Sequence, residues 1–143
     1  MPLLPPSTNR AYRGAPASAW FLTLAGVMSL VPGLIHYFLP DGGAGVIAGM
    51  DLSTRRQTII TMFAWFGALQ IPYALAQITI SLRYRPLVPF FLALIVLERG
   101  LMAFDGWFGK GAGGHHPPEH YGSPVAAGLA LVFLILSLRV SDR

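Results

Sequence analysis

Apolar residues dominate four stretches of this 143-residue chain, and short polar segments separate them. The stretches cover roughly residues 19–39, 58–82, 87–108 and 124–140. An α-helix of this length crosses, or nearly crosses, a hydrocarbon core about 30 Å thick. The pattern therefore predicts an all-α, polytopic membrane protein. Its expected form is a four-helix antiparallel transmembrane bundle over 17–143, preceded by an irregular cytoplasmic arm over 1–16.

The composition agrees with this class of protein. Hydrophobic residues make up 54% of the chain and charged residues only 11%, whereas a soluble domain carries about 25% charged residues. Four spans leave only short connections, and hence no room for a soluble catalytic domain. The first ten residues lack a basic segment followed by an apolar run, so the first stretch is expected to be a retained span. The absence of cysteine excludes disulfides and thiolate metal sites.

The basic residues flank the apolar stretches, so they indicate orientation and lipid contact rather than a nucleic-acid partner. One side would carry Arg10, Arg13, Arg83, Arg85, Arg139 and Arg143, and the other side Arg55, Arg56 and Lys110. Cytoplasmic loops are the richer in Lys and Arg. The bias therefore predicts that both termini are cytoplasmic.

Local signals suggest how the helices begin and pair. The tight connection over 83–86 predicts that the second and third stretches form an antiparallel hairpin. Asp51 or Ser53 is expected to cap the second helix. Ser123 and Pro124 are expected to be the N-cap and first residue of the fourth helix.

The second stretch carries a polar stripe. Gln70 and Gln77 are seven residues apart and so share one helix face, with Tyr73 close to it. In lipid these side chains would lack partners, so they are expected to face the bundle interior. Pro72 in the same stretch removes one backbone donor.

The third stretch places Glu98 and Arg99 near its centre, where charge is costly in a membrane. Asp105 lies seven residues after Glu98 on the same face, with Met102 between them. One interpretation is a buried acid that serves proton transfer or a polar ligand. The other is a structural cluster in which Arg99 pairs with an acid and Gln70 completes the hydrogen bonds.

The connection before the fourth stretch is rich in histidine. Its potential metal ligands are His115, His116, Glu119 and His120. Imidazole and carboxylate suit zinc, copper or nickel. Pro117 and Pro118 are expected to prevent a helix here and to hold 119–121 extended across the bundle mouth. No metal or other cofactor is therefore predicted, and metal binding by this loop is kept as an alternative.

His36 lies at the outer end of the first stretch. Asp105, Arg55 and the histidine-rich loop are expected at the same level. Together they could form an outward-facing polar pocket for a lipid headgroup, a quinone or another amphiphile. The alternative is an interfacial histidine that donates to a carbonyl.

Residues 18–140 resemble the small four-helix bacterial membrane proteins grouped as DoxX-like. The resemblance rests on the four short spans, on Asp51 with Arg55-Arg56 before the second span, and on Arg99-Gly100 with Asp105-Gly106 in the third. It implies a four-helix fold in a bacterial inner membrane and no particular reaction.

Two functions follow from these observations. The first is non-catalytic: an accessory or structural subunit that packs against a larger membrane protein complex, or a homo-oligomer, in contact with membrane lipids. The second is a small membrane enzyme or binding protein for a lipid, sterol-like or quinone-like ligand. In that case Glu98 and Asp105 are the acid/base pair, and His36 and Arg99 orient the ligand. The expected cavity is lined by Gln70, Glu98 and Met102.

Overall fold

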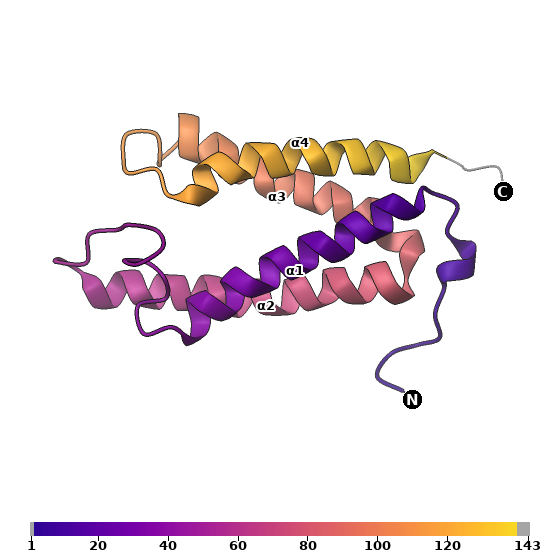
Figure 1. Ribbon diagram of the computed structural model, residues 1–143, viewed down its shortest axis with the longest axis horizontal. Helices are drawn as coiled ribbons and strands as arrows, with labels where there is room; N and C mark the ends of the chain where they lie inside the picture. Colours follow the sequence, from indigo (N-terminus) through magenta and orange to yellow (C-terminus); the bar gives the residue numbers. More distant parts are fainter. Residues whose placement is uncertain (1, 140–143) are drawn as a thin grey trace.

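The computed structural model describes residues 2–139, and all regular secondary structure in this range is helical (Figure 1). Its elements are the 3-10 turn η1 (Asn9–Ala11), α1 (Pro16–Phe38), α2 (Arg56–Arg83), the 3-10 turn η2 (Arg85–Leu87), α3 (Val88–Phe108) and α4 (Pro118–Leu138). Each long helix has the length and apolar character needed to cross a membrane. The prediction of four apolar helices is confirmed.

The start of α4 differs from the prediction. The helix begins at Pro118 rather than Pro124, and Glu119 to Tyr121 are helical rather than extended. A proline is tolerated at the first helical position because that residue's N–H has no helical acceptor. Pro124 instead lies inside α4 and leaves the carbonyl of His120 without its helical donor. The indole Nε1 of Trp107 in α3 donates to that carbonyl at 2.8 Å.

The helices form two pairs, α1 with α2 and α3 with α4 (Figure 1). α1 and α2 approach closely at glycines. A Cβ at Gly67 of α2 would lie 2.6 Å from the carbonyl oxygen of Gly33 in α1. α2 and α3 make few contacts, so the predicted hairpin of the second and third stretches is wrong. The short connection keeps only the ends of α2 and α3 close together, because it carries the chain from one pair to the other.

The two pairs meet in an apolar core toward the end where α1 begins and α4 ends. The buried residues of this core are Ala19, Leu22, Val88, Leu92, Ile95 and Ala130. Beside it, Phe21 stacks on Phe133 with ring centroids 4.3 Å apart. Ser18 Oγ donates to the Phe133 carbonyl at 2.8 Å. These contacts join α1 to α4 at one end of the bundle.

The N-terminal arm, irregular apart from η1, is tied to the end of α2. Asn9 Nδ2 donates to the Leu82 carbonyl at 2.6 Å. The Thr8 N–H and the Ser7 hydroxyl both donate to the Arg83 carbonyl, each at 2.9 Å. The last carbonyls of a helix have no partner within it. The arm supplies these missing donors and so completes the end of α2.

The connection between α1 and α2 is organised by Asp41. Its carboxylate accepts the backbone N–H groups of Gly43, Gly45 and Val46 at 2.8, 3.1 and 3.1 Å. These bonds favour the ionised form, so they hold the pKa of Asp41 below its ordinary value. One short side chain thereby fixes the loop that follows α1.

The start of α2 lacks the predicted cap. Its N-cap is Arg55, in a left-handed conformation with φ of 52° and no side-chain capping bond. Asp51 instead accepts the N–H and hydroxyl of Ser53 at 2.8 and 2.9 Å. The prediction that Asp51 or Ser53 caps α2 is wrong, because these two residues satisfy each other within the loop.

Candidate functional site

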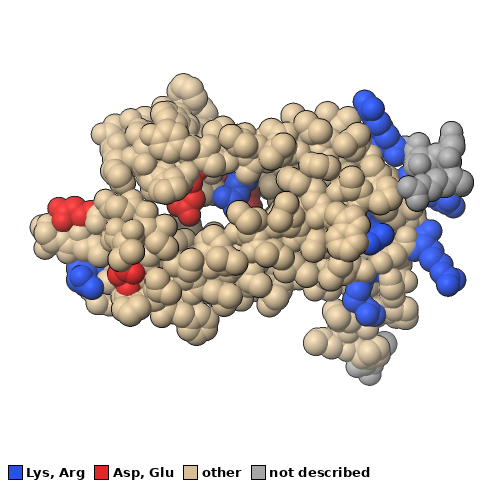
Figure 2. Space-filling model, in the orientation of Figure 1, with Lys and Arg blue, Asp and Glu red and all other residues tan. Residues whose placement is uncertain are grey.

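A cavity of about 670 Å³ lies between the two helix pairs. Figure 2 shows the molecule hollowed there, with acidic and basic side chains at the rim. Most of its wall is apolar, and includes Phe21, Leu24, Ala25, Met28, Ile95 and Leu129. Ligand sites for small molecules typically measure about 300–1,000 Å³ and are mainly apolar with a few polar groups. The size and wall of this cavity fit that description.

Three buried polar atoms in this wall have no hydrogen-bond partner within the described part of the chain. They are Gln70 Oε1, Gln77 Oε1 and Ser123 Oγ. Gln77 and Ser123 are each only 1% exposed. A buried polar group without a partner costs about 1–3 kcal/mol. The three residues line the cavity, but the three oxygens themselves are closed off from it, so a ligand can supply the missing hydrogen bonds only when these side chains turn toward it.

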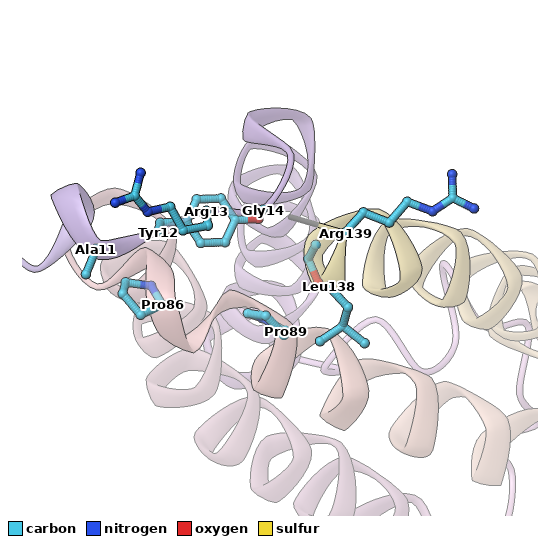
Figure 3. A pocket seen from close by; sticks show the side chains of 9 residues that line it. Ala11, Tyr12, Arg13, Gly14, Pro86, Pro89, Leu138 and Arg139 are labelled. Atoms are coloured by element: carbon cyan, nitrogen blue, oxygen red, sulfur yellow. The ribbon is translucent and has the colours of Figure 1, made fainter. Parts of the chain in front are cut away.

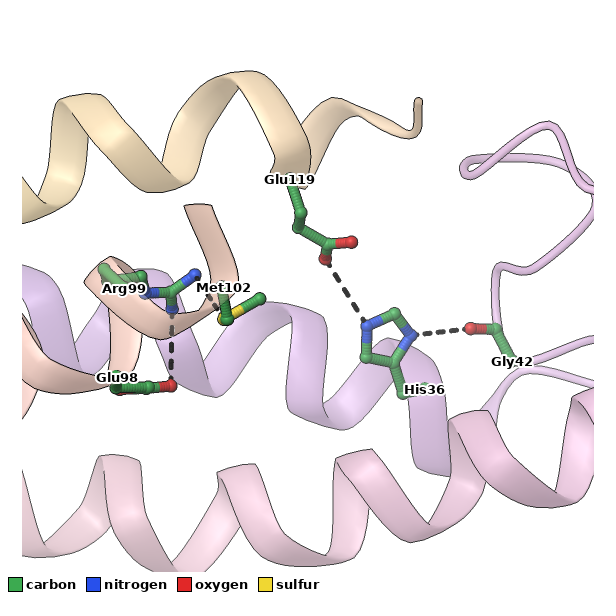
Figure 4. Close-up of polar contacts among 6 residues, drawn as sticks. All are labelled: His36, Gly42, Glu98, Arg99, Met102 and Glu119. Atoms are coloured by element: carbon green, nitrogen blue, oxygen red, sulfur yellow. Dashed lines mark hydrogen bonds and ion pairs between the residues drawn. The ribbon is translucent and has the colours of Figure 1, made fainter. Parts of the chain in front are cut away.

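Glu98 and Arg99 line the same cavity from α3. Arg99 Nη2 lies 4.0 Å from Glu98 Oε1, and Arg99 Nη1 lies 4.0 Å from the Met102 sulfur (Figure 4). The two charges offset each other, although the separation is long for a hydrogen bond. A guanidinium has several N–H donors and no acceptor. The guanidinium therefore keeps donors available for a ligand, and the pair carries no net charge when Glu98 is ionised.

The structure separates Asp105 from Glu98. Asp105 lies outside the cavity wall, and its Oδ1 accepts the Lys110 N–H at 3.0 Å. Its backbone carbonyl accepts the Gly109 N–H at 3.1 Å. Asp105 thus organises the loop after α3. Met102 contacts Arg99 but is not part of the cavity wall.

His36 and Glu119 connect the two helix pairs beside the cavity. His36 Nδ1 lies 2.7 Å from the Gly42 carbonyl, and since a carbonyl only accepts, Nδ1 carries a proton. The other ring nitrogen, Nε2, lies 3.8 Å from Glu119 Oε1 (Figure 4). Glu119 lines the cavity, whereas His36 does not. A second connection joins His115 Nε2 to the Ala48 carbonyl at 2.7 Å.

The histidine-rich connection does not gather its potential ligands. His116 Nδ1 lies 2.8 Å from His120 Nδ1, and the His116 ring stacks on Trp107 at 4.7 Å. His115 contacts Ala48, as described above. Over residues 2–139, no group of three or more His, Cys, Asp or Glu side chains is arranged to hold a metal ion.

Part of this site could be read from sequence. The predicted ligand-binding residues Gln70, Glu98 and Arg99 line the cavity, and the seven-residue spacing also indicated Gln77. Ser123 was missed as a site residue because its place beside a proline suggested a helix cap. As a binding residue, Glu119 is indicated by the sequence only as a potential metal ligand.

A search of protein families, of curated proteins and of solved structures found no match to this chain. The resemblance to DoxX-like proteins therefore contributes no argument about function, which follows from the cavity and its residues.

Proposed function

We propose that this chain is an integral membrane protein that binds a neutral amphiphile in the cavity between its two helix pairs. The ligand class is a lipid, sterol-like or quinone-like molecule with a small hydrogen-bonding head. The observation that carries the proposal is a largely apolar cavity whose wall contains three polar side chains, Gln70, Gln77 and Ser123, each with a buried oxygen that has no partner among residues 2–139.

The distribution of charge supports membrane insertion with a defined orientation (Figure 2). The end where α1 begins carries five described arginines and no described acid: Arg10, Arg13, Arg83, Arg85 and Arg139. The opposite end carries Arg55, Arg56 and Lys110 together with Asp41, Asp51 and Asp105. By the positive-inside rule, this distribution favours a cytoplasmic location for both termini. The proposed location is a bacterial inner membrane.

The charges in the cavity favour a ligand without net charge. Glu98 and Arg99 offset each other, and Glu119 faces His36 rather than an unpaired cation. A ligand with a negative charge would lie near the carboxylates of Glu98 and Glu119. A ligand with a positive charge would compete with Arg99 for Glu98. A neutral head can instead hydrogen-bond to Gln70 and Gln77 while its apolar body lies on the aromatic and aliphatic wall.

Binding is better supported than acid/base catalysis, because the second carboxylate of the predicted pair, Asp105, lies outside the cavity. Association with a larger membrane complex or with further copies of the chain stays a prediction. This association can be tested by identifying the proteins that co-purify with the chain and by measuring its oligomeric state.

The test is to purify the protein in a mild detergent and identify co-purifying neutral lipids by mass spectrometry. Replacing Gln77 by Leu preserves approximate volume and removes one hydrogen-bonding group. The variant should retain about threefold to tenfold less of the lipid, the worth of one hydrogen bond.

Gln57→Leu is the matched control, since Gln57 is an exposed glutamine in the first turn of α2. This variant should retain the lipid at the wild-type level. If the wild-type protein carries no neutral lipid above the background of empty micelles, or if Gln77→Leu carries as much as wild type, the proposed function is wrong.

A further inference from the structure

A second, smaller pocket of about 220 Å³ lies at the arginine-rich end (Figure 3). Three segments that are distant in sequence form it: residues 11–14 of the arm, Pro86 and Pro89 before and within the first turn of α3, and residues 137–139 at the end of α4. The pocket is separate from the cavity between the helix pairs, and the two share no lining residue.

The pocket combines two cations with an apolar floor. Arg13 and Arg139 stand at its opposite edges, with their guanidinium groups directed outward (Figure 3). Pro86, Pro89 and Leu138 supply apolar surface between them. Long arginine side chains can lie along apolar surface and still place the charged group in the polar headgroup region.

The fold determines the spacing of these two arginines. Gly14 packs so tightly on the end of α4 that a Cβ there would overlap the Ser137 carbonyl oxygen. The Ala15 N–H donates to the Leu136 carbonyl at 3.3 Å, and the Tyr12 hydroxyl donates to the Ala15 carbonyl at 3.0 Å. Burial raises the pKa of Tyr12, so this hydroxyl keeps its proton. The arm that carries Arg13 is therefore fixed to α4.

We propose that this pocket binds the phosphate-bearing headgroup of an anionic phospholipid, with Arg13 and Arg139 turning onto the phosphate. Arginine suits this ligand because its planar fork of donors matches phosphate oxygens. The prolines and Leu138 contact the glycerol and the first acyl carbons. The inference rests on the proposed membrane insertion and is independent of the ligand in the larger cavity.

The experiment titrates the full chain in neutral detergent with phosphatidylglycerol or phosphatidylcholine and counts bound lipids by native mass spectrometry. Phosphatidylglycerol should bind more tightly. Removing both charges by Arg13→Gln with Arg139→Gln should weaken its binding about 30-fold, since each arginine near a charged headgroup contributes about fivefold. Arg55→Gln with Arg56→Gln, which removes the same charge from the opposite end, should leave binding near wild type.

Gly14→Ala tests whether binding needs the shaped pocket or only the positive charge at this end of the molecule. The substitution removes no charge but forces the arm away from α4. It should weaken phosphatidylglycerol binding while Gly128→Ala, whose Cβ meets nothing within 4 Å, does not. Three results would overturn the inference. The two double arginine variants could lose the same amount of phosphatidylglycerol binding, Gly14→Ala could bind it as wild type does, or the wild-type protein could bind the two lipids equally well. Displacement of phosphatidylglycerol by an equal concentration of inorganic phosphate would also overturn it. Retention of the neutral lipid by each variant shows that the larger cavity is intact, which keeps the two proposals distinguishable.

Discussion

Gly67 offers a test of how α1 and α2 are held together. A Cβ at this position would lie 2.6 Å from the Gly33 carbonyl oxygen, 2.8 Å from the Tyr37 backbone nitrogen and 3.1 Å from His36 Cβ. The first two of these atoms belong to the backbone of α1, so they cannot turn aside as a flexible side chain can. In Gly67→Ala, the two helices must therefore separate along this contact.

The size of the effect follows from these distances. The shortest contact has to lengthen from 2.6 Å to at least 3.0 Å, the limit below which real Cβ contacts essentially never occur. The separation also loosens the neighbouring contact between Gly33 and Gln70, where the corresponding Cβ distance is 3.1 Å. Overpacking a well-packed contact costs about 1–3 kcal/mol. We expect the free energy of unfolding of Gly67→Ala to fall by that amount.

The assay is reversible unfolding in mixed micelles with increasing denaturing detergent, followed by far-ultraviolet circular dichroism. Gly128→Ala in α4 is the control, because a Cβ there meets no atom within 4 Å. It makes the same chemical change within a helix and should be neutral or stabilising by up to about 1 kcal/mol, the helix preference of Ala over Gly. If Gly67→Ala is as stable as Gly128→Ala, the close approach of α1 and α2 at this glycine is refuted.

Three further predictions use independent parts of the fold. Asn9→Ala removes the donor to the Leu82 carbonyl at the end of α2 and should lower the free energy of unfolding by about 1 kcal/mol in the same assay; an unchanged value would mean that the arm does not stabilise α2. Trp107→Phe leaves the His120 carbonyl without its donor and should cost a similar amount, about 1 kcal/mol, whereas a gain in stability would contradict this role. The pKa of Asp41 is depressed in the fold, so its contribution to loop order is complete above its ordinary value of 3.8 and is lost as the pH falls through the lower folded value. Amide signals of the loop should therefore titrate with a midpoint below 3.8, and a midpoint at or above that value would exclude the bonded carboxylate.

The extent of the helices was predictable because a long apolar run has few alternatives to a helix. Errors arose where a local signal had two solutions. Pro118 and Pro124 can each begin a helix, and the earlier one does so because Trp107 of α3 compensates the carbonyl that Pro124 leaves free. Similarly, Asp51 and Ser53 look like caps for α2 but bond to each other in the loop. For α4 the deciding partner lies on another helix, whereas for α2 the two candidate caps satisfy each other.

The candidate site was predictable only where one helix supplies the whole signal. The spacing of Gln70 and Gln77 indicated a polar face, and charge in an apolar run singled out Glu98 and Arg99. Helical periodicity also grouped Asp105 with Glu98, yet Asp105 lies at the end of α3, where it bonds to the following loop. Ser123 and Glu119 join the site only because α4 begins early enough to bring them to the cavity.

The sequence by itself determined the four apolar helices, their short connections and the concentration of arginine at one end. These properties depend on residues close together in the chain, where apolar side chains and internal backbone hydrogen bonds favour helices. Only the tertiary structure decided that α1 pairs with α2 and α3 with α4. That pairing depends on contacts such as Gly67 against Gly33, which no local pattern encodes. The cavity exists because the two pairs are joined by an apolar core at one end and leave the space between them unfilled.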